Sequence, residues 1–423
     1  MNRADPARQA AAALILGVTE GGATLSDLLA NGALSSLAPP DRARAQRLAL
    51  LTLRHLGSAD AVLRAHLRRT PPPEILAILR LATVEMLEEG APAHGVVDAA
   101  VTLARGRAES FAGLVNAVAR KVGATSPETW TALPPPAMPD WLRGRLMNAW
   151  GRRAVLAMEL AHRRGAPLDL TPKSGDAAGL AETLGGAVTA TGSVRLSGHP
   201  KQVSQLPGYT AGDWWVQDAA AALPARVLAP RAGERVLDLC AAPGGKTLQL
   251  AAAGASVTAL DISAPRMARL AANLARCGVE ATQVVADALV WAPETPFDAV
   301  LLDAPCSATG TIRRHPDLPF ARDPASLRAL AALQAELIDR ALGFLAPGGR
   351  LVFATCSLLR EEGEEQVTAA LARHPGLVVD TAALALPGVE AGWIGPEGGL
   401  RLRPDYWPET GGIDGFLIAC LRR

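Results

Sequence analysis

The chain has 423 residues, of which 49% are apolar and 20% are charged, and its formal net charge is +1 at pH 7. The length predicts two or three domains with separate cores, and the balanced charge excludes a polyanion-binding field over the whole protein. Its five cysteines include no Cys-x-x-Cys pair, which argues against a disulfide framework and a zinc site and favours a reducing cytoplasm; we expect no metal.

The first third of the chain has the apolar period of helices throughout. The start, "MNRADPARQAAAALILGV", reads as a helix and not as a signal peptide, and no apolar run is long enough to span a membrane. "DRARAQRLALLTLRHL" predicts a helix capped by Asp41, and "PEILAILRLATVEML", "HGVVDAAVTLAR" and "FAGLVNAVARKV" predict three more. We therefore expect an all-α domain over residues 1–130.

Three further regions follow. Residues 131–165 contain a proline-rich linker and then a basic helix, and residues 166–225, with short glycine-rich segments, predict a small α/β subdomain. From 226 to 423, the strands "RVLDLCA", "SVTALDI", "ATQVVADA", "FDAVLLDAP" and "GGRLVFATCS" alternate with helices. This alternation predicts a parallel, doubly wound α/β sheet, which binds ligands at the carboxyl ends of its strands.

Small and acidic residues follow the first three of these strands. "LDLCAAPGGKT" places Gly244 and Gly245 between a strand and a helix, but it lacks the first glycine of a P-loop and is not a GxGxxG motif. A simple tight turn is the alternative. Asp261 and Asp287 are placed to meet ribose hydroxyls and a nucleobase edge, although either alone is equally well a helix cap. Together these strand ends favour S-adenosylmethionine over ATP or NAD.

Two cysteines occupy matching positions. "LLDAPCSATG" and "LVFATCSLL" each end an apolar strand on a Cys-Ser pair, at Cys306 and Cys356. A thiolate suits addition to C6 of cytosine, which makes C5 nucleophilic toward a methyl sulfonium. Two thiols suggest that one attacks and the other assists release. The alternative is that both are core residues, as we expect for the other three cysteines.

The chain resembles the RsmB (Fmu/Sun) group of RNA cytosine-C5 methyltransferases over nearly its whole length. "CAAPGGKT", "LDAPCSATGTIRRHPD", "ATCSLLREEGEEQV", "DGFLIACL" and "VQDAAA" are similar to the catalytic-domain motifs. "DRARAQRLALLTLRH" and "FAGLVNAVARKV" are similar to the family's NusB-like RNA-binding domain. The resemblance implies a Rossmann-like class I methyltransferase domain. The sequence departs from it at "PLDLTPKSG", where the family often has an Arg-Val-Asn-like stretch.

The resemblance also implies roles for individual residues. It makes Cys356 the nucleophile, lets Cys306 assist product release, and places Asp303 at the cytosine edge. DNA cytosine-C5 methyltransferases assign the nucleophile to the other cysteine. The positions implied to bind S-adenosylmethionine are Cys240, Ala241, Ala242, Pro243, Gly244, Gly245, Lys246, Asp261, Arg266, Asp287 and Asp303.

RNA contacts are predicted from charge. Arg313 and Arg314 follow Cys306 closely and are the favoured contacts with RNA phosphates. Arg322 and the basic helix are predicted to add further phosphate contacts. The glutamates of "REEGEEQV" are expected to open a helix after Cys356.

We expect the protein to be a cytoplasmic monomer that methylates cytosine C5 in 16S ribosomal RNA, before or during its assembly, and that binds neither DNA nor a membrane. The alternatives are the same chemistry on tRNA or another rRNA, and a non-catalytic RNA-binding factor for ribosome assembly.

Overall fold

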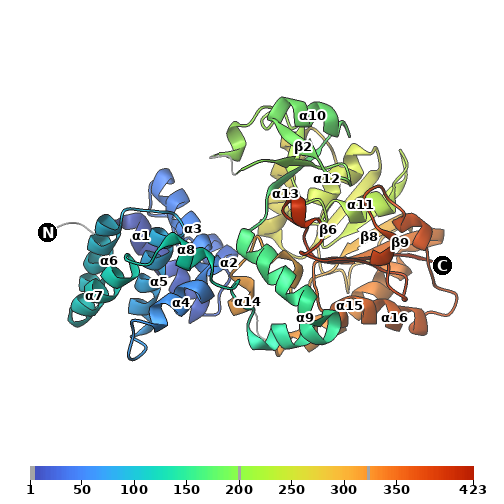
Figure 1. Cartoon of the computed structure of the whole chain (residues 1–423). Helices are drawn as coiled ribbons and strands as arrows, with labels where there is room; N and C mark the ends of the chain where they lie inside the picture. Colours follow the sequence, from blue (N-terminus) through green and yellow to red (C-terminus); the bar gives the residue numbers. More distant parts are fainter. Residues whose placement is uncertain (1–4, 199–201, 322–323) are drawn as a thin grey trace. The chain divides into compact units, whose positions relative to one another are not determined.

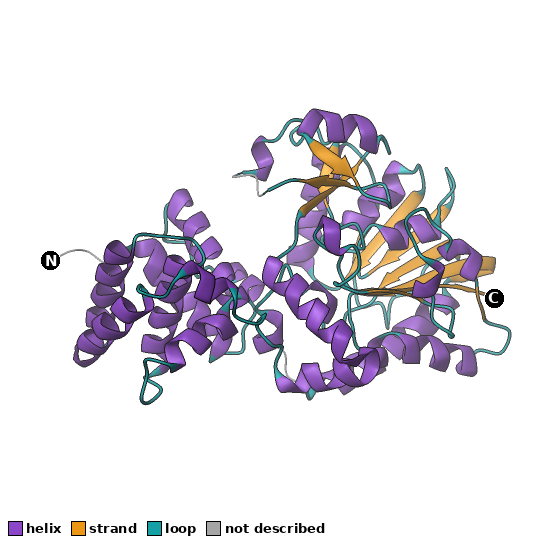
Figure 2. Ribbon diagram, in the orientation of Figure 1, coloured by secondary structure: helices purple, strands orange, loops and turns teal. Residues whose placement is uncertain are grey.

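The structure, a computed structural model of the whole chain, describes residues 5–198, 202–321 and 324–423. It divides into two compact units: residues 1–165 with 312–323, and residues 166–311 with 324–423. Figures 1 and 2 show a first unit that is helical and a second that is built on sheets. None of the helices in the described ranges has the length and apolar character needed to cross a bilayer.

The first unit is all-α, as the apolar period of residues 1–130 predicted, and it also includes residues 131–165, which the sequence analysis set apart. Its helices are α1 (Pro6–Thr19), α2 (Leu25–Ala30), α3 (Pro39–Arg54), α4 (Leu56–Arg64), α5 (Pro73–Leu87), α6 (Ala93–Arg107), α7 (Ala112–Val122), α8 (Pro127–Thr131), α9 (Asp140–Arg164) and α14 (Leu318–Ala321). Prolines begin several of them, because a proline in the first turn has no N–H to leave unpaired. The basic helix α9 is broken at Gly151, which has φ of 78°.

Segment 312–323, with α14, belongs to this unit although it lies far along the sequence. The Asp317 carboxylate accepts the Leu25 N–H at 2.8 Å, and the Arg54 guanidinium donates to the Arg313 carbonyl at 2.9 Å. Trp141 Nε1 donates to the Pro319 carbonyl at 3.4 Å. The helical unit is therefore completed by residues from within the catalytic half of the sequence, which the sequence pattern did not predict.

The second unit contains a small antiparallel sheet with strand order β2-β3-β1-β4. These elements are β1 (Leu168–Pro172), β2 (Gly186–Val188), β3 (Val194–Leu196) and β4 (Trp214–Val216), with helix α10 (Ala177–Leu184). The sheet lies within residues 166–225, where glycine-rich segments predicted a small α/β region, and it belongs to the same compact unit as the larger sheet.

The larger sheet of the second unit has strand order β10-β12-β9-β8-β5-β6-β7, with β11 paired to β12. Its strands are β5 (Arg235–Leu239), β6 (Ser256–Asp261), β7 (Thr282–Val285), β8 (Phe297–Asp303), β9 (Leu345–Thr355), β10 (Val378–Val379), β11 (Leu400–Leu402) and β12 (Phe416–Arg422). Its helices are α11 (Leu223–Leu228), α12 (Gly245–Ala252), α13 (Ala264–Cys277), α15 (Ser326–Gly343) and α16 (Glu364–Arg373). The five predicted strands pair in parallel, and β10, β11 and β12 add an antiparallel edge.

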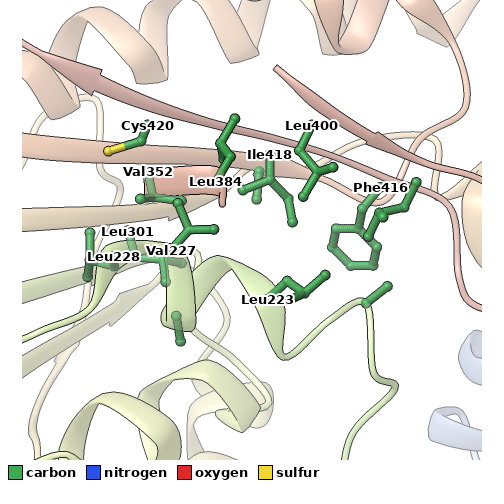
Figure 3. Close-up of a cluster of buried hydrophobic side chains, with 14 of the residues drawn as sticks. Leu223, Val227, Leu228, Leu301, Val352, Leu384, Leu400, Phe416, Ile418 and Cys420 are labelled. Atoms are coloured by element: carbon green, nitrogen blue, oxygen red, sulfur yellow. The ribbon is translucent and has the colours of Figure 1, made fainter. Parts of the chain in front are cut away.

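Strand side chains alternate between two cores, one on each face of this sheet. Leu301 and Val352 belong to the core that includes α11, whereas Leu302 and Phe353 belong to the core that includes α15. Figure 3 shows the first of these cores, where Cys420 lies among the leucines and valines. Cys420 is completely buried and is a core residue, as expected from the sequence. This burial raises the pKa of its thiol to about 11.

Candidate active site

The two Cys-Ser turns converge at one edge of the larger sheet. Strands β8 and β9 are parallel neighbours, and Asp303 pairs with Ala354. Cys306 lies three residues beyond the end of β8 and Cys356 directly follows β9, so both lie at the same edge of the sheet. The Sγ atoms of Cys306 and Cys356 lie 3.5 Å apart, and both side chains are half-buried. The structure thus brings together two residues that are 50 positions apart in the sequence.

Backbone hydrogen bonds tie these two turns to the start of β12. The Gly310 N–H donates to the Cys356 carbonyl at 2.9 Å, and the Gly415 N–H donates to the Gly310 carbonyl at 2.8 Å. A Cβ on Gly310 would lie 2.1 Å from the Gly415 oxygen, so only glycine fits there. This explains the glycines of "CSATG" and "DGF": they allow three chain segments to cross at the site.

Glu362 joins the two serines that follow the cysteines. Its carboxylate accepts the Ser307 N–H at 2.9 Å and the Ser357 hydroxyl at 2.6 Å, and it also accepts the Ser307 hydroxyl. Gln334 donates to the same carboxylate at 3.2 Å and to the Pro305 carbonyl at 2.8 Å. Glu362 is completely buried. One buried carboxylate therefore fixes both cysteine turns.

The sequence prediction for the glutamates was only partly right. Glu364 and Glu365 lie in the first turn of α16, as expected, but Glu362 precedes that helix in a short 3-10 turn (Arg360–Glu362). Its signal in the sequence is faint, because a glutamate in an acidic run is usually a solvated residue.

The surroundings of Cys306 disfavour its ionisation. The hydrogen bond with Cys356, then burial, and then the charge of Glu362 raise the pKa of Cys306 well above its ordinary value. Cys306 is consequently held as a neutral thiol beside the Cys356 sulfur. A neutral thiol is a poor nucleophile but a suitable hydrogen-bond donor to a neighbouring thiolate.

Lys246, in the first turn of α12, forms an ion pair with Asp303 at the end of β8. The Lys246 ammonium lies 2.7 Å from the Asp303 carboxylate and 5.5 Å from the centre of the Phe416 ring. Burial alone would lower the pKa of Lys246, but Asp303 and Asp238 together raise it above its ordinary value. The lysine therefore stays charged and orients a half-buried carboxylate at the same strand edge as the cysteines.

The glycine-rich turn between β5 and α12 is shaped by its neighbours. Gly244 has φ of 108°, and a Cβ there would lie 2.9 Å from Leu270. Asp261 is buried; its carboxylate accepts the N–H groups of Ala242 at 3.1 Å and Ser263 at 2.9 Å. Arg266 lies 3.6 Å from Asp261 and donates to the Ala242 carbonyl. Asp261 thus holds the turn in place from the adjacent strand.

Asp238 is a residue that the sequence reasoning missed. It lies inside β5, is completely buried, and accepts the Thr247 hydroxyl at 2.6 Å, while its other carboxylate oxygen has no hydrogen-bond partner. Burial raises its pKa to about 7, against the opposing Thr247 hydrogen bond. The available signal was an aspartate within the otherwise apolar stretch "RVLDLCA".

The residues at these strand ends fit an adenosine-bearing cation. Ile262, directly after Asp261, is 70% exposed, and Val290 is 78% exposed. Exposed apolar side chains of this kind suit the face of a nucleobase, while Asp261 and Asp303 supply carboxylates and the glycine turn allows close approach. Asp287 lies two residues beyond the end of β7, where it also accepts the Leu289 N–H at 2.9 Å.

A buried ion pair joins two strands of the small sheet. Asp169 on β1 binds Arg195 on β3 through two hydrogen bonds of 2.7 Å, and Asp169 also accepts the Ala219 N–H at 3.1 Å. The Arg195 guanidinium reaches the carbonyls of Thr410 and Gly412 at 2.8 and 2.9 Å. Arg195 therefore joins the small sheet to the segment that leads into β12.

The predicted RNA-contacting arginines belong to the helical unit. The Arg313 side chain is buried, and Arg314 is half-buried. Burial of His162, and then the charges of Arg313 and Arg54, lower the pKa of His162 to about 3. Contact of Arg313 and Arg314 with RNA stays a prediction. Arg322 lies outside the described residues.

Comparison with known families identifies both halves of the chain. Residues 225–422 match the family "16S rRNA methyltransferase RsmB/F", and residues 5–124 match the NusB family. The chain is 35% identical to ribosomal RNA small subunit methyltransferase B of Erwinia tasmaniensis, with 97% of each chain covered. It is 36% identical to the protein of that name from Xanthomonas campestris, covering 98% of this chain and 96% of that one.

Solved structures show the same fold. The structure of PH0851 aligns over all of both chains with a TM-score of 0.73 at 24% identity. A methyltransferase homologue from Pyrococcus horikoshii aligns with a TM-score of 0.57 at 27% identity, covering 66% of this chain and 94% of that one. With these matches across both halves, the chain belongs to the RsmB/F family of S-adenosylmethionine-dependent RNA methyltransferases.

Proposed function

We propose that this protein methylates C5 of a cytosine in 16S ribosomal RNA through a covalent bond between Cys356 and C6 of the base. The observation that carries the proposal is the 3.5 Å separation of two thiols delivered by separate strands. A pair of core cysteines would not require the buried carboxylate, the crossing glycines and the ion pair that surround these two side chains.

The chemistry divides between the thiols. Addition of the Cys356 thiolate to C6 moves the ring electrons to C5, which then takes a methyl group. Once a base removes the C5 proton, the bond between sulfur and C6 breaks and the electron pair returns to the Cys356 sulfur. The Cys306 thiol, 3.5 Å away, donates a hydrogen bond to that leaving sulfur and so favours release. The base must leave its stack to reach this buried edge.

The remaining site residues bind and orient. S-adenosylmethionine, when bound, supplies the electrophilic methyl group. The turn from Cys240 to Lys246, together with Asp261, Arg266 and Asp287, would hold its adenosine and amino-acid parts. Asp303, oriented by Lys246 at 2.7 Å, faces the same strand edge and is suited to accept hydrogen bonds from the cytosine amino group.

The choice of 16S rRNA rests on the relatives, which carry the name ribosomal RNA small subunit methyltransferase B, and on the NusB match of the helical unit. The same chemistry on tRNA or another rRNA is the second candidate. A non-catalytic assembly factor is disfavoured because it would have no need of two thiols held 3.5 Å apart at the ligand-binding edge of the sheet.

Trapping of the adduct tests the assignment of the cysteines. In Cys306→Ala, the Cys356 thiolate should still attack C6 and the base should still be methylated, but the RNA should be released slowly. A protein–RNA adduct should therefore survive denaturing electrophoresis. Cys356→Ala and the double variant should show none. An adduct in Cys356→Ala would instead make Cys306 the nucleophile, and absence of any adduct from all variants, with wild-type methylation retained, would contradict the covalent route.

A second experiment identifies the substrate. Bisulfite sequencing of rRNA and tRNA from cells that lack the gene should show one unmethylated cytosine in 16S rRNA. A lost signal in tRNA or 23S rRNA would favour the second candidate. Failure of the purified protein to transfer radiolabel to any RNA, with cofactor still bound, would favour the assembly factor.

A further inference from the structure

A cavity of about 410 Å³ lies in the second unit, away from the two cysteines. Its wall is formed by the end of β1, the loop leading to α10, the turn before β3, the middle of β4, α11 and the second half of α12. It is lined by Thr171, Pro172, Lys173, Ser174, Gly175, Ala177, Gly192, Trp215, Arg226, Gln249, Ala252 and Ala253. This volume is in the range of small-molecule sites. The cavity is at the C-terminal end of α12, whereas the glycine turn of the active site is at its N-terminal end.

Arg226 is the first reason to expect an anion there. Its guanidinium packs over Gly192, where a Cβ would lie 3.1 Å from Nη1. Within the described parts of the chain it has neither a hydrogen bond nor an ion pair, and burial lowers its pKa. A half-buried guanidinium without a partner is costly, and a bound anion would offset that cost.

Lys173 is the second reason. Its ammonium donates one hydrogen bond, to the Cys277 carbonyl at 2.9 Å, so further N–H groups remain for a ligand. Ser174, exposed at the rim, adds a hydroxyl. Two cations line the cavity, and none of its described lining residues has an acidic side chain.

The other polar groups of the wall are already engaged. The Thr171 hydroxyl and Trp215 Nε1 donate to the Gln217 amide oxygen at 2.9 and 2.8 Å. Gln217 in turn donates to Gln249 at 2.7 Å, and Gln249 donates to the Ala222 carbonyl at 3.0 Å. The groups left for a ligand are therefore cationic donors beside a rigid wall.

We infer that this cavity binds the phosphate group of a nucleotide, with Arg226 and Lys173 as its ligands. Arginine presents a planar set of donors that matches two phosphate oxygens, and lysine adds a point charge. The phosphate belongs either to the backbone of a bound RNA or to a free mononucleotide. The inference does not depend on which cysteine attacks or on whether the base methylated is cytosine.

The test uses the full chain, saturated with S-adenosylmethionine so that the active-site pocket is filled. The variants are Arg226→Gln and Lys173→Gln. Arg269→Gln, which removes the same charge from an exposed position on α13, is the matched control. The ligands are uridine monophosphate, uridine as the version without phosphate, and a single-stranded RNA of about 12 nucleotides.

A free nucleotide site predicts that the wild type binds uridine monophosphate more tightly than uridine, and that Arg226→Gln weakens the former about tenfold. An RNA backbone site predicts weaker RNA binding in the same variant and a salt-dependence slope that is smaller by about 0.7. If Arg226→Gln and Lys173→Gln bind both uridine monophosphate and RNA as tightly as Arg269→Gln does, the inference is wrong. Unchanged cofactor affinity and melting temperature show that the variants are folded. If Arg226→Gln unfolds, Arg226→Lys and Lys173→Gln decide in its place.

Discussion

At the scale of single residues, the feature that most constrains the chemistry is Glu362, a buried carboxylate shared by Ser307 and Ser357. Each serine follows a cysteine, so the spacing of the two sulfurs depends on a residue that contacts neither of them. Charged hydrogen bonds of this kind contribute about 1.5–3 kcal/mol each.

Glu362→Gln should therefore lower the rate of methyl transfer at least tenfold while cofactor affinity stays unchanged. The amide keeps the shape of the side chain, but it cannot accept all the hydrogen bonds at once. Single-turnover transfer and calorimetric titration with S-adenosylmethionine measure the two effects. Glu365→Gln, an exposed neighbour on α16, is the control. Equal rates for the two variants would show that Glu362 has no positioning role.

Asp238 gives a prediction about pH. Its pKa is raised from 3.8 to about 7 in the folded protein, so the folded state binds this proton more tightly than the unfolded state. The free energy of unfolding should then decrease as pH rises from about 4 to 7, because ionisation of the buried group is disfavoured. The total is of the order of a few kcal/mol.

In Asp238→Asn this contribution should be absent. The difference in unfolding free energy between variant and wild type should grow in favour of the variant from pH 5 to pH 8, as measured by urea unfolding. A difference that stays constant over this range would show that Asp238 is ionised throughout.

At the scale of elements, the ion pair between Asp169 on β1 and Arg195 on β3 gives a prediction about stability. Asp169→Ala should destabilise the second unit by about 3–5 kcal/mol, because it leaves the Arg195 charge buried without its partner. Replacing both residues, Asp169→Leu with Arg195→Met, should cost less. Chemical unfolding compares them, and a double variant that is less stable than Asp169→Ala would contradict the argument.

The elements also show how much of the fold could be predicted from the sequence. The five parallel strands were predictable because buried strands are continuous apolar runs followed by turns, and Cys306, Cys356 and Asp261 lie at their ends. Strand β12 pairs antiparallel between β9 and β10, and nothing in "DGFLIACL" indicates which neighbours it takes. The prediction that Asp41 caps this helix is wrong, because α3 begins two residues earlier, at Pro39. Glu362 could not be found because its partners are brought together only by the fold.

At the scale of the whole molecule, the division of the chain suggests a truncation. A chain beginning at Ala166 should keep the second unit folded and bind S-adenosylmethionine within about threefold of the full-length affinity, since its cores are its own. Segment 312–323 would lose the partners of Asp317 and of the Arg313 carbonyl. Trypsin should then cut after Arg313 or Arg314, whereas the full chain is protected there. Equal rates of cleavage in the two chains would show that the segment does not depend on the helical unit.

The assignment of residues 312–323 to the helical unit has a consequence for synthesis on the ribosome. A chain emerges from its N-terminus, and domains ordinarily fold in that order. Here the first 165 residues leave the exit tunnel well before the segment that supplies Asp317 to the Leu25 N–H. The helical unit therefore lacks residues 312–323 until most of the sheet unit has been translated. The part of the protein that is made first is among the last to be finished.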